Sequence, residues 1–183
     1  MPRIILITGG ARSGKSRYAI SFFDHNQQVV YIATSRIEDE EMRERVQQHQ
    51  QSRPPTWKTF EGTYNLDKAT EGEYQVSHYL LDCVGVLTAN IMFDLTRTYE
   101  RIPLELQQKV EDTVVQELAR LIQKIIALDG WLVMVTNEVG SSIVPENHVA
   151  RVYRDILGRV NQRLAALCNE VDLVTCGIPL QLK

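Results

Sequence analysis

Ile4-Ile5-Leu6-Ile7-Thr8 runs directly into Gly9-Gly10-Ala11-Arg12-Ser13-Gly14-Lys15-Ser16, and this stretch decides the fold. The apolar, β-branched run predicts a buried strand, and the second segment fits the G-x-x-x-x-G-K-[ST] pattern of a phosphate loop that leads into a helix. Glycines let such a loop curl until its backbone N–H groups surround phosphate oxygens, beside the positive end of the following helix. The sequence therefore predicts a site for a nucleoside triphosphate at residues 9–16.

Two side chains of this loop have predicted roles in that site. Lys15 is expected to reach the β- and γ-phosphates, and the Ser16 hydroxyl is expected to bind Mg²⁺. An acid at the end of a neighbouring apolar strand usually completes the metal shell. The run from His78 to Leu81 ends at Asp82, which is therefore the candidate. The alternative for Asp82 is an aspartate that caps the next helix.

Composition limits the class of protein. A chain of 183 residues with 44% hydrophobic and 23% charged residues is typical of one soluble globular domain, here residues 1–183. A net charge of −3 and the lack of a basic tail argue against nucleic acid as a partner. Cys83, Cys168 and Cys176 form no C-x-x-C pair and are expected to be small core residues of a reducing compartment. The N-terminus runs straight into a strand, so we expect no signal peptide or membrane anchor and, by default, a cytoplasmic enzyme.

Short apolar runs alternate with helical segments along the chain. The runs are continuous, which is typical of strands buried on both faces of a mostly parallel sheet. They are Ile4–Thr8, Val29–Ala33, Tyr79–Leu81, Leu132–Thr136 and Val171–Thr175, with Trp57–Phe60 a weaker candidate. Helices are predicted over Ser16–Phe23, Glu38–Gln51, Leu104–Leu128 and Glu146–Leu167, the third of them capped by Gly130. We predict an α/β fold of three layers, a RecA-like P-loop fold with a mostly parallel central sheet flanked by helices.

Three features leave two interpretations open. Asn137 and Glu138 follow a predicted strand, where they either orient a reacting group or form a turn. The last helix carries Arg151, Arg154, Arg159 and Arg163 around Asp155, which indicates an anion site or, more commonly, a solvated face with Arg151/Asp155 and Asp155/Arg159 pairs.

His49 is the third such feature. It lies on the thin apolar stripe of the polar helix 38–51, where a histidine is commonly structural. A helix with so few apolar residues is expected to attach loosely over the nucleotide, and there a neutral imidazole is able to attack phosphorus. Arg53 and Glu61 flank the same region as weaker candidates for contacts to a base or a phosphate.

The motifs, taken in order, resemble those of one family. They are Ile7–Arg17, Tyr31–Thr34, Arg45-Val46 with His49 and Arg53-Pro54, Val135–Gly140, Ile143–Glu146, Arg154-Asp155 with Gly158, Asn161-Gln162 and Gly177–Leu180. The set is similar to that of the bifunctional adenosylcobinamide kinases / adenosylcobinamide-phosphate guanylyltransferases of cobalamin biosynthesis. The resemblance runs from residue 4 to the C-terminus.

This resemblance implies two reactions and a set of site residues. ATP or GTP phosphorylates the hydroxyl of the aminopropanol arm of adenosylcobinamide. GTP then guanylylates an enzyme histidine, and the GMP passes to the new phosphate to give adenosylcobinamide-GDP. His49 matches that histidine, and the loop 9–16 holds the nucleotide. Further nucleotide contacts implied by position are Thr34, Ser35, Arg36, Gln50, Gln51, Ser52, Arg53, Glu61 and Asp82. The family is also associated with homotrimers.

Three positions depart from the family pattern. Gln48 stands where some relatives have a second histidine, and Asp82 stands where glutamate is frequent. Ser142 replaces a glycine expected in Asn-Glu-Val-Gly-x-Gly, which leaves the backbone of that loop open. The main alternative function is a single-activity P-loop kinase of a small molecule, in which His49 is structural. A recombinase-like ATPase is disfavoured by the net charge.

Overall fold

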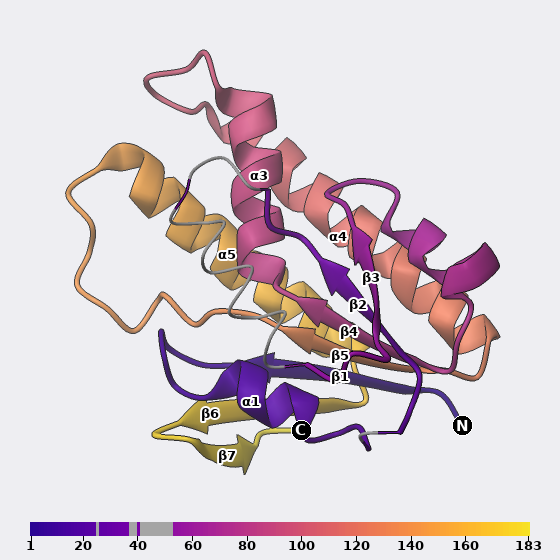
Figure 1. The fold of residues 1–183 in the computed structure, drawn as a ribbon. Helices are drawn as coiled ribbons and strands as arrows, with labels where there is room; N and C mark the ends of the chain where they lie inside the picture. The colour runs from indigo at the N-terminus through magenta and orange to yellow at the C-terminus, as the bar shows by residue number, and fades with distance from the viewer. Residues whose placement is uncertain (25, 37–39, 41–52) are drawn as a thin grey trace.

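The computed structural model describes residues 1–24, 26–36, 40 and 53–183. Its centre is a seven-stranded sheet with the order β3-β2-β4-β5-β1-β6-β7 (Figure 1). The strands are β1 (Arg3–Thr8), β2 (Val29–Ala33), β3 (Lys58–Glu61), β4 (His78–Asp82), β5 (Trp131–Val135), β6 (Glu170–Thr175) and β7 (Ile178–Gln181). Neighbouring strands are parallel except β6 and β7, which are antiparallel. The prediction of a mostly parallel central sheet is confirmed.

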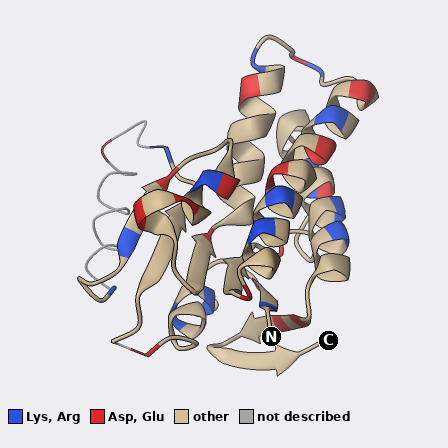
Figure 2. Ribbon diagram, turned by 90° about the vertical axis from the view of Figure 1, so that its right-hand side faces the viewer, with Lys and Arg blue, Asp and Glu red and all other residues tan. Residues whose placement is uncertain are grey.

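Helices cover both faces of this sheet. They are α1 (Lys15–Ile20), α3 (Val84–Thr96), α4 (Leu104–Ala127) and α5 (His148–Leu167), with short 3-10 turns η1 (Leu66–Thr70) and η2 (Gly72–Tyr74). Helices α3, α4 and α5 lie on one face and α1 lies on the other (Figure 1). Basic and acidic residues are interspersed along the long helices (Figure 2). The predicted helix Glu38–Gln51 falls outside the described residues, apart from Glu40.

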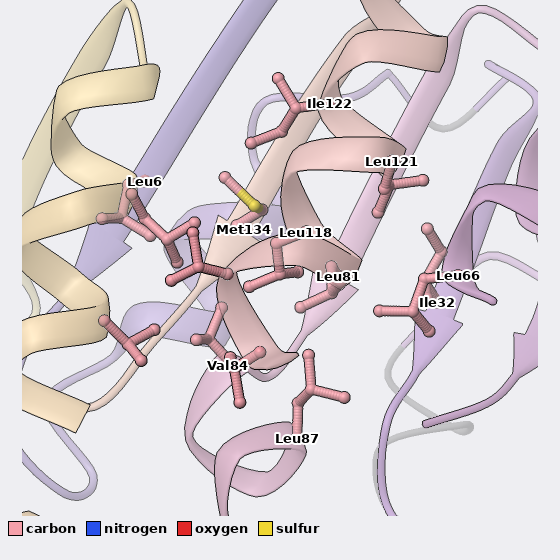
Figure 3. Close-up of a cluster of buried hydrophobic side chains, with 14 of the residues drawn as sticks. Leu6, Ile32, Leu66, Leu81, Val84, Leu87, Leu118, Leu121, Ile122 and Met134 are labelled. Atoms are coloured by element: carbon pink, nitrogen blue, oxygen red, sulfur yellow. The ribbon is translucent and has the colours of Figure 1, made fainter. Parts of the chain in front are cut away.

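Alternate residues of β1 enter two separate cores. Ile4 and Leu6 pack against the helices α3, α4 and α5, in the cluster that Figure 3 shows in part. Ile5 and Ile7 point to the other face and pack beneath α1. All four side chains are buried. Burial on both faces explains why the strand is a continuous apolar run instead of an alternating one.

The end of α4 differs from the prediction by one residue. Asp129, rather than Gly130, takes the left-handed conformation, with φ +52°. The Asp129 N–H donates to the Ile126 carbonyl at 3.0 Å and the Gly130 N–H donates to the Ile125 carbonyl at 2.9 Å, a Schellman ending. Gly130 avoids crowding, because a Cβ there would lie 3.2 Å from the carbonyl oxygen of Ser77.

The cysteines are not all core residues. Cys168 is buried and Cys83 is half-buried, but Cys176 is exposed at the turn between β6 and β7. The prediction of a core position was therefore wrong for Cys176. Among the helices of the described ranges, none combines the length and apolar character needed to span a bilayer.

Candidate nucleotide-binding site

The predicted phosphate loop lies at the carboxyl end of β1, between the ends of β5 and β6 (Figure 1). Ligands of open α/β sheets bind at this edge. The chain leaving β5 follows the end of β1 closely, since the Thr136 N–H donates to the Ile7 carbonyl at 2.8 Å and the Glu138 N–H donates to the Gly9 carbonyl at 2.9 Å. The loop is thus fixed on both sides by strands that come much later in the chain.

Two glycines of the loop are needed for close approach. A Cβ on Gly9 would lie 2.3 Å from the carbonyl oxygen of Val174, which no side chain tolerates. Gly14 has φ +101°, and a Cβ there would lie 3.1 Å from the Cα of Gly177. The loop and the first residues of α1 line an open depression of about 400 Å³, formed by residues 12–17.

Lys15 lies inside this loop. Only 7% of the residue is exposed, and its Nζ donates to the carbonyl oxygen of Gly10 at 2.5 Å. Burial lowers the pKa of the Lys15 ammonium, while the nearby Cys83 and Asp82 oppose that shift. The ammonium is therefore held at the concave side of the loop, where its predicted role requires it.

The loop also contains an unsatisfied buried polar atom. The Oγ of Ser13 is buried and finds no hydrogen-bond partner among the described residues. A buried hydroxyl of this kind is costly unless a ligand or water satisfies it. The chemistry of Ser16 and Asp82 also fits Mg²⁺, which favours one or two oxygen ligands from the protein together with substrate phosphates. Both residues are half-buried at this edge of the sheet.

Asp82 ends β4 and is held by a residue that the sequence analysis did not single out. The Tyr31 hydroxyl donates to Asp82 Oδ2 at 3.1 Å, and the Arg53 guanidinium carbon lies 3.2 Å from the centre of the Tyr31 ring. Burial, reinforced by Asp82, raises the pKa of Tyr31. Burial lowers the pKa of Arg53. The capping alternative for Asp82 was wrong, because the N-cap of α3 is Cys83, whose Sγ accepts from the Val86 N–H at 3.4 Å.

A second depression, of about 520 Å³, opens beside the ends of β2 and β3. It is lined by Thr34, Ser35, Arg36, Glu61, Gly62, Thr63 and Tyr64, so four predicted nucleotide contacts share one site. The Thr34 side chain is buried and serves the scaffold, since its Oγ1 donates to the Cys83 carbonyl at 2.8 Å.

Arg36 is fixed in the wall of this second depression. Its two terminal nitrogens donate to the two carboxylate oxygens of Asp94, each at 2.7 Å, and its Nε donates to Thr63 Oγ1 at 3.1 Å. The Tyr64 hydroxyl donates to the same carboxylate at 3.0 Å. The hydrogen bonds from Arg36 hold the pKa of Asp94 below its usual range. Asp94, on α3, thereby joins two loops of the site, and no pattern in the sequence marks it.

Glu138 forms a turn. Its Oε1 accepts the Gly140 N–H at 2.7 Å and the Ser141 N–H at 3.2 Å, so the turn interpretation is favoured. Ser142 fits this loop without a left-handed φ, and its Oγ donates to the Val139 carbonyl at 2.9 Å. The substitution of serine for the expected glycine is therefore accommodated.

The arginines of α5 do not form the predicted pairs. Arg159 donates to Glu111 Oε2 at 2.6 Å, and Arg163 donates to Glu111 Oε1 at 3.0 Å and to Asp112 at 2.7 Å. Arg151 donates to the carbonyl oxygens of Pro145 and Glu146. The expected Arg151/Asp155 and Asp155/Arg159 pairs were wrong, because Asp155 pairs with its neighbour Arg154 at 3.3 Å, while Arg159 reaches across to α4.

The remaining predicted site residues are not placed. His49, Gln50, Gln51 and Ser52 lie outside the described residues, so their roles stay predictions. Among residues the sequence analysis missed, Tyr31 stands in the motif Tyr31–Thr34, which was a usable signal. Gly177 likewise stands in a quoted motif without an assigned role.

Comparison with known proteins gives one consistent result. A family model described as cobinamide kinase / cobinamide phosphate guanyltransferase matches residues 5–182. The chain is 44% identical to the bifunctional adenosylcobalamin biosynthesis protein CobU of Escherichia coli (strain K12), over 98% of this chain and 99% of that protein. It is 43% identical to the CobU protein of Salmonella typhimurium, with 98% and 99% covered, and 32% identical to the CobP protein of Pseudomonas aeruginosa, with 97% and 96% covered. The resemblance deduced from the motifs is confirmed, and the fold is that of a P-loop enzyme. The chain belongs to the cobinamide kinase / cobinamide phosphate guanyltransferase family.

Proposed function

We propose that this chain, acting as one domain, phosphorylates adenosylcobinamide with ATP or GTP and then attaches GMP to the product through His49. The observation that carries the first step is the position of Lys15. Its buried ammonium lies inside a loop of glycines and donates to the Gly10 carbonyl at 2.5 Å, in the place where phosphate oxygens would replace that carbonyl. This arrangement supports transfer of a phosphoryl group.

The described residues have separate tasks in the kinase reaction. Backbone N–H groups of the loop 9–16 and Lys15 hold the triphosphate, and Ser16 and Asp82 would hold Mg²⁺. The metal, when bound, offsets the negative charge on the phosphate oxygens. Ser35, Arg36 and Glu61 line the second depression, which is the proposed place for the nucleoside. The substrate hydroxyl oxygen attacks the γ-phosphorus, a P–O bond forms as the bond to the β–γ bridging oxygen breaks, the nucleoside diphosphate leaves, and the hydroxyl proton passes to solvent.

The guanylyl transfer proceeds in two displacements. The neutral imidazole of His49 attacks the α-phosphorus of GTP, a P–N bond forms, and the bond to pyrophosphate breaks. A phosphate oxygen of the phosphorylated substrate then attacks the same phosphorus and releases the imidazole. Because the imidazole must be neutral, acid is expected to inhibit the first displacement.

Intact-mass spectrometry after incubation with GTP and Mg²⁺ tests this assignment. We expect a mass increase of one GMP that is lost in acid and is absent from His49→Ala. His148→Gln is the matched control and should keep the adduct, because His148 only accepts the Ile102 N–H at 3.1 Å, which glutamine can replace. If the wild type forms no adduct, the alternative of a single-activity kinase with a structural His49 takes its place.

The assembly is proposed on the family resemblance. We propose a homotrimer that works in the cytoplasm on a corrinoid substrate, without nucleic acid as a partner. Light scattering should then give the mass of three chains of 20.9 kDa. A mass of one chain at micromolar concentration would contradict the trimer.

A further inference from the structure

The turn between β6 and β7 contacts the phosphate loop directly, although the two lie at opposite ends of the sequence (Figure 1). The Gly177 N–H donates to the carbonyl oxygen of Ser13 at 2.8 Å. A Cβ on Gly14 would lie 3.1 Å from the Cα of Gly177, so the two backbones touch. The family motif Gly177–Leu180 has no role in the function proposed above, and this contact offers one.

The turn has a defined backbone that presents this N–H. Thr175 and Ile178 are paired residues of the antiparallel ladder, which leaves Cys176 and Gly177 as a two-residue loop. Their φ values are +51° and +78°, both left-handed. Two left-handed residues are the mark of a type I′ hairpin turn, which favours glycine at the second position. The N–H of that second residue projects outward from the hairpin, and here it meets Ser13.

The hydrogen bond sets the direction of one peptide group in the phosphate loop. Because a trans peptide directs its C=O and N–H to opposite sides, fixing the Ser13 carbonyl toward Gly177 turns the Gly14 N–H away from the hairpin. If the peptide were reversed, the negative end of its dipole would face the phosphates, and an anion site needs N–H groups there.

We propose that Gly177 is a positioning residue for nucleotide binding, which holds the Ser13–Gly14 peptide with its N–H available to phosphate. The proposal rests on the nucleotide-binding role proposed above for residues 9–16. Gly177 is exposed, and β7 is an exposed edge strand, so little of the core depends on this turn. The effect is therefore expected on nucleotide affinity more than on folding.

Glycine substitutions with a matched control test the proposal. In Gly177→Ala the left-handed φ is strained, while the new Cβ meets only the flexible Nη2 of Arg17 at 3.2 Å. Gly72, in η2, also has a left-handed φ, +57°, but nothing lies within 4 Å of a Cβ built there, so it does not contact the phosphate loop through that position. Gly72→Ala therefore carries the backbone strain without the contact. Asparagine tolerates left-handed φ better than alanine, so Gly177→Asn serves as a partial rescue.

The readouts are the Kd for a non-hydrolysable GTP analogue, from calorimetric titration with Mg²⁺, and the Tm of each variant. Alanine keeps the N–H, but its strained left-handed φ should move that N–H away from Ser13, so we expect Gly177→Ala to raise the Kd about three- to tenfold, the range for the loss of one hydrogen bond. The Kd of Gly177→Asn should lie between those of Gly177→Ala and the wild type. Gly72→Ala should bind the analogue as tightly as the wild type, although its Tm should fall about as much as that of Gly177→Ala. In turnover, the KM for nucleotide should rise in Gly177→Ala while kcat at saturation changes little.

Other outcomes overturn the proposal. Equal Kd values for Gly177→Ala and the wild type would mean that the turn does not position the loop. The same conclusion follows if Gly72→Ala weakens binding equally. If Gly177→Ala does not fold, the Kd of Gly177→Asn tests the proposal in its place. If neither variant folds, Gly177 is needed for folding and the positioning role is rejected. A wild-type chain that binds no nucleotide contradicts the proposed function, which is a distinct result.

Discussion

The hydroxyl of Tyr31 donates a 3.1 Å hydrogen bond to Oδ2 of Asp82, which ties the middle of β2 to the end of β4. The two strands are neighbours, with Ala33 opposite Asp82. Arg53 covers the other side of the Tyr31 ring at 3.2 Å, a cation–π contact. The proposed metal-binding carboxylate therefore accepts a hydrogen bond from a buried phenol whose ring contacts Arg53.

Tyr31→Phe removes this orientation without removing the ring. We expect the Mg²⁺ concentration for half-maximal kinase activity to rise about tenfold, as for the loss of a partner that orients a metal ligand. Tyr18→Phe is the matched control, because the Tyr18 hydroxyl donates to Asp172 at 3.0 Å in a similar Tyr–Asp pair elsewhere. A Mg²⁺ titration that is unchanged in Tyr31→Phe, or shifted equally in Tyr18→Phe, would contradict this role.

Asp94→Asn should loosen the wall of the second depression. The carboxylate receives both terminal nitrogens of Arg36 and the hydroxyl of Tyr64, and an amide cannot accept all of these bonds. We expect the KM for nucleotide to rise about threefold to tenfold. Glu73→Gln is the control, since Glu73 forms only an exposed pair with Lys58 at 3.8 Å. A KM equal to that of the wild type would remove Asp94 from the site.

The pH dependence of stability should have a definite sign below neutrality. Hydrogen bonds from Arg36 and Arg3 hold the pKa of Asp94 and of Glu170 below their ordinary values of 3.8 and 4.5. The unfolded chain therefore binds more protons in acid, so this stabilisation is complete above about pH 5 and is lost as the pH falls through the lowered values. The Tm should fall steeply below pH 4. Glu170→Gln should lower the Tm at pH 7 and should make the fall of the Tm in acid less steep. An equally steep fall in this variant would contradict the contribution of Glu170.

Glu111 should matter more for stability than its neighbour Asp112. Glu111 is 5% exposed and binds both Arg159 and Arg163, whereas Asp112 is half-buried and accepts from one arginine, Arg163, and from the neutral amide of Gln108. We expect Glu111→Gln to lower the free energy of unfolding by about 1–3 kcal/mol. Asp112→Asn should lower it by less than about 1 kcal/mol, as for surface ion pairs. Urea unfolding measures both, and equal losses would show that burial of the carboxylate is unimportant.

The elements that local sequence determines were predictable. The run Ile4–Thr8 is apolar on both faces, and the phosphate loop has a strict spacing, so β1 and the loop were placed correctly. Helix α3 was missed, because apolar residues such as Val86 and Phe93 also stand outside its buried stripe, so that Val84–Thr96 shows no one-sided pattern in the sequence. The predicted Asp155/Arg159 pair was wrong because Arg159 binds Glu111, which comes close only after α4 and α5 pack. The contact of Tyr31 with Asp82 depends on the pairing of β2 with β4, and the contacts of Asp94 depend on where α3 packs, which local spacing does not encode.

The position of β1 between β5 and β6 has a consequence for biosynthesis. The strand that carries the phosphate loop is synthesised before both of its neighbours in the sheet and before the hairpin turn at Gly177. These pairings join distant segments, so they form late and require long stretches of chain to close. A nascent chain that lacks residues after Leu167 therefore exposes one edge of β1. We therefore expect nucleotide binding at the loop, and the protection that it gives, to await the synthesis of β6 and its hairpin.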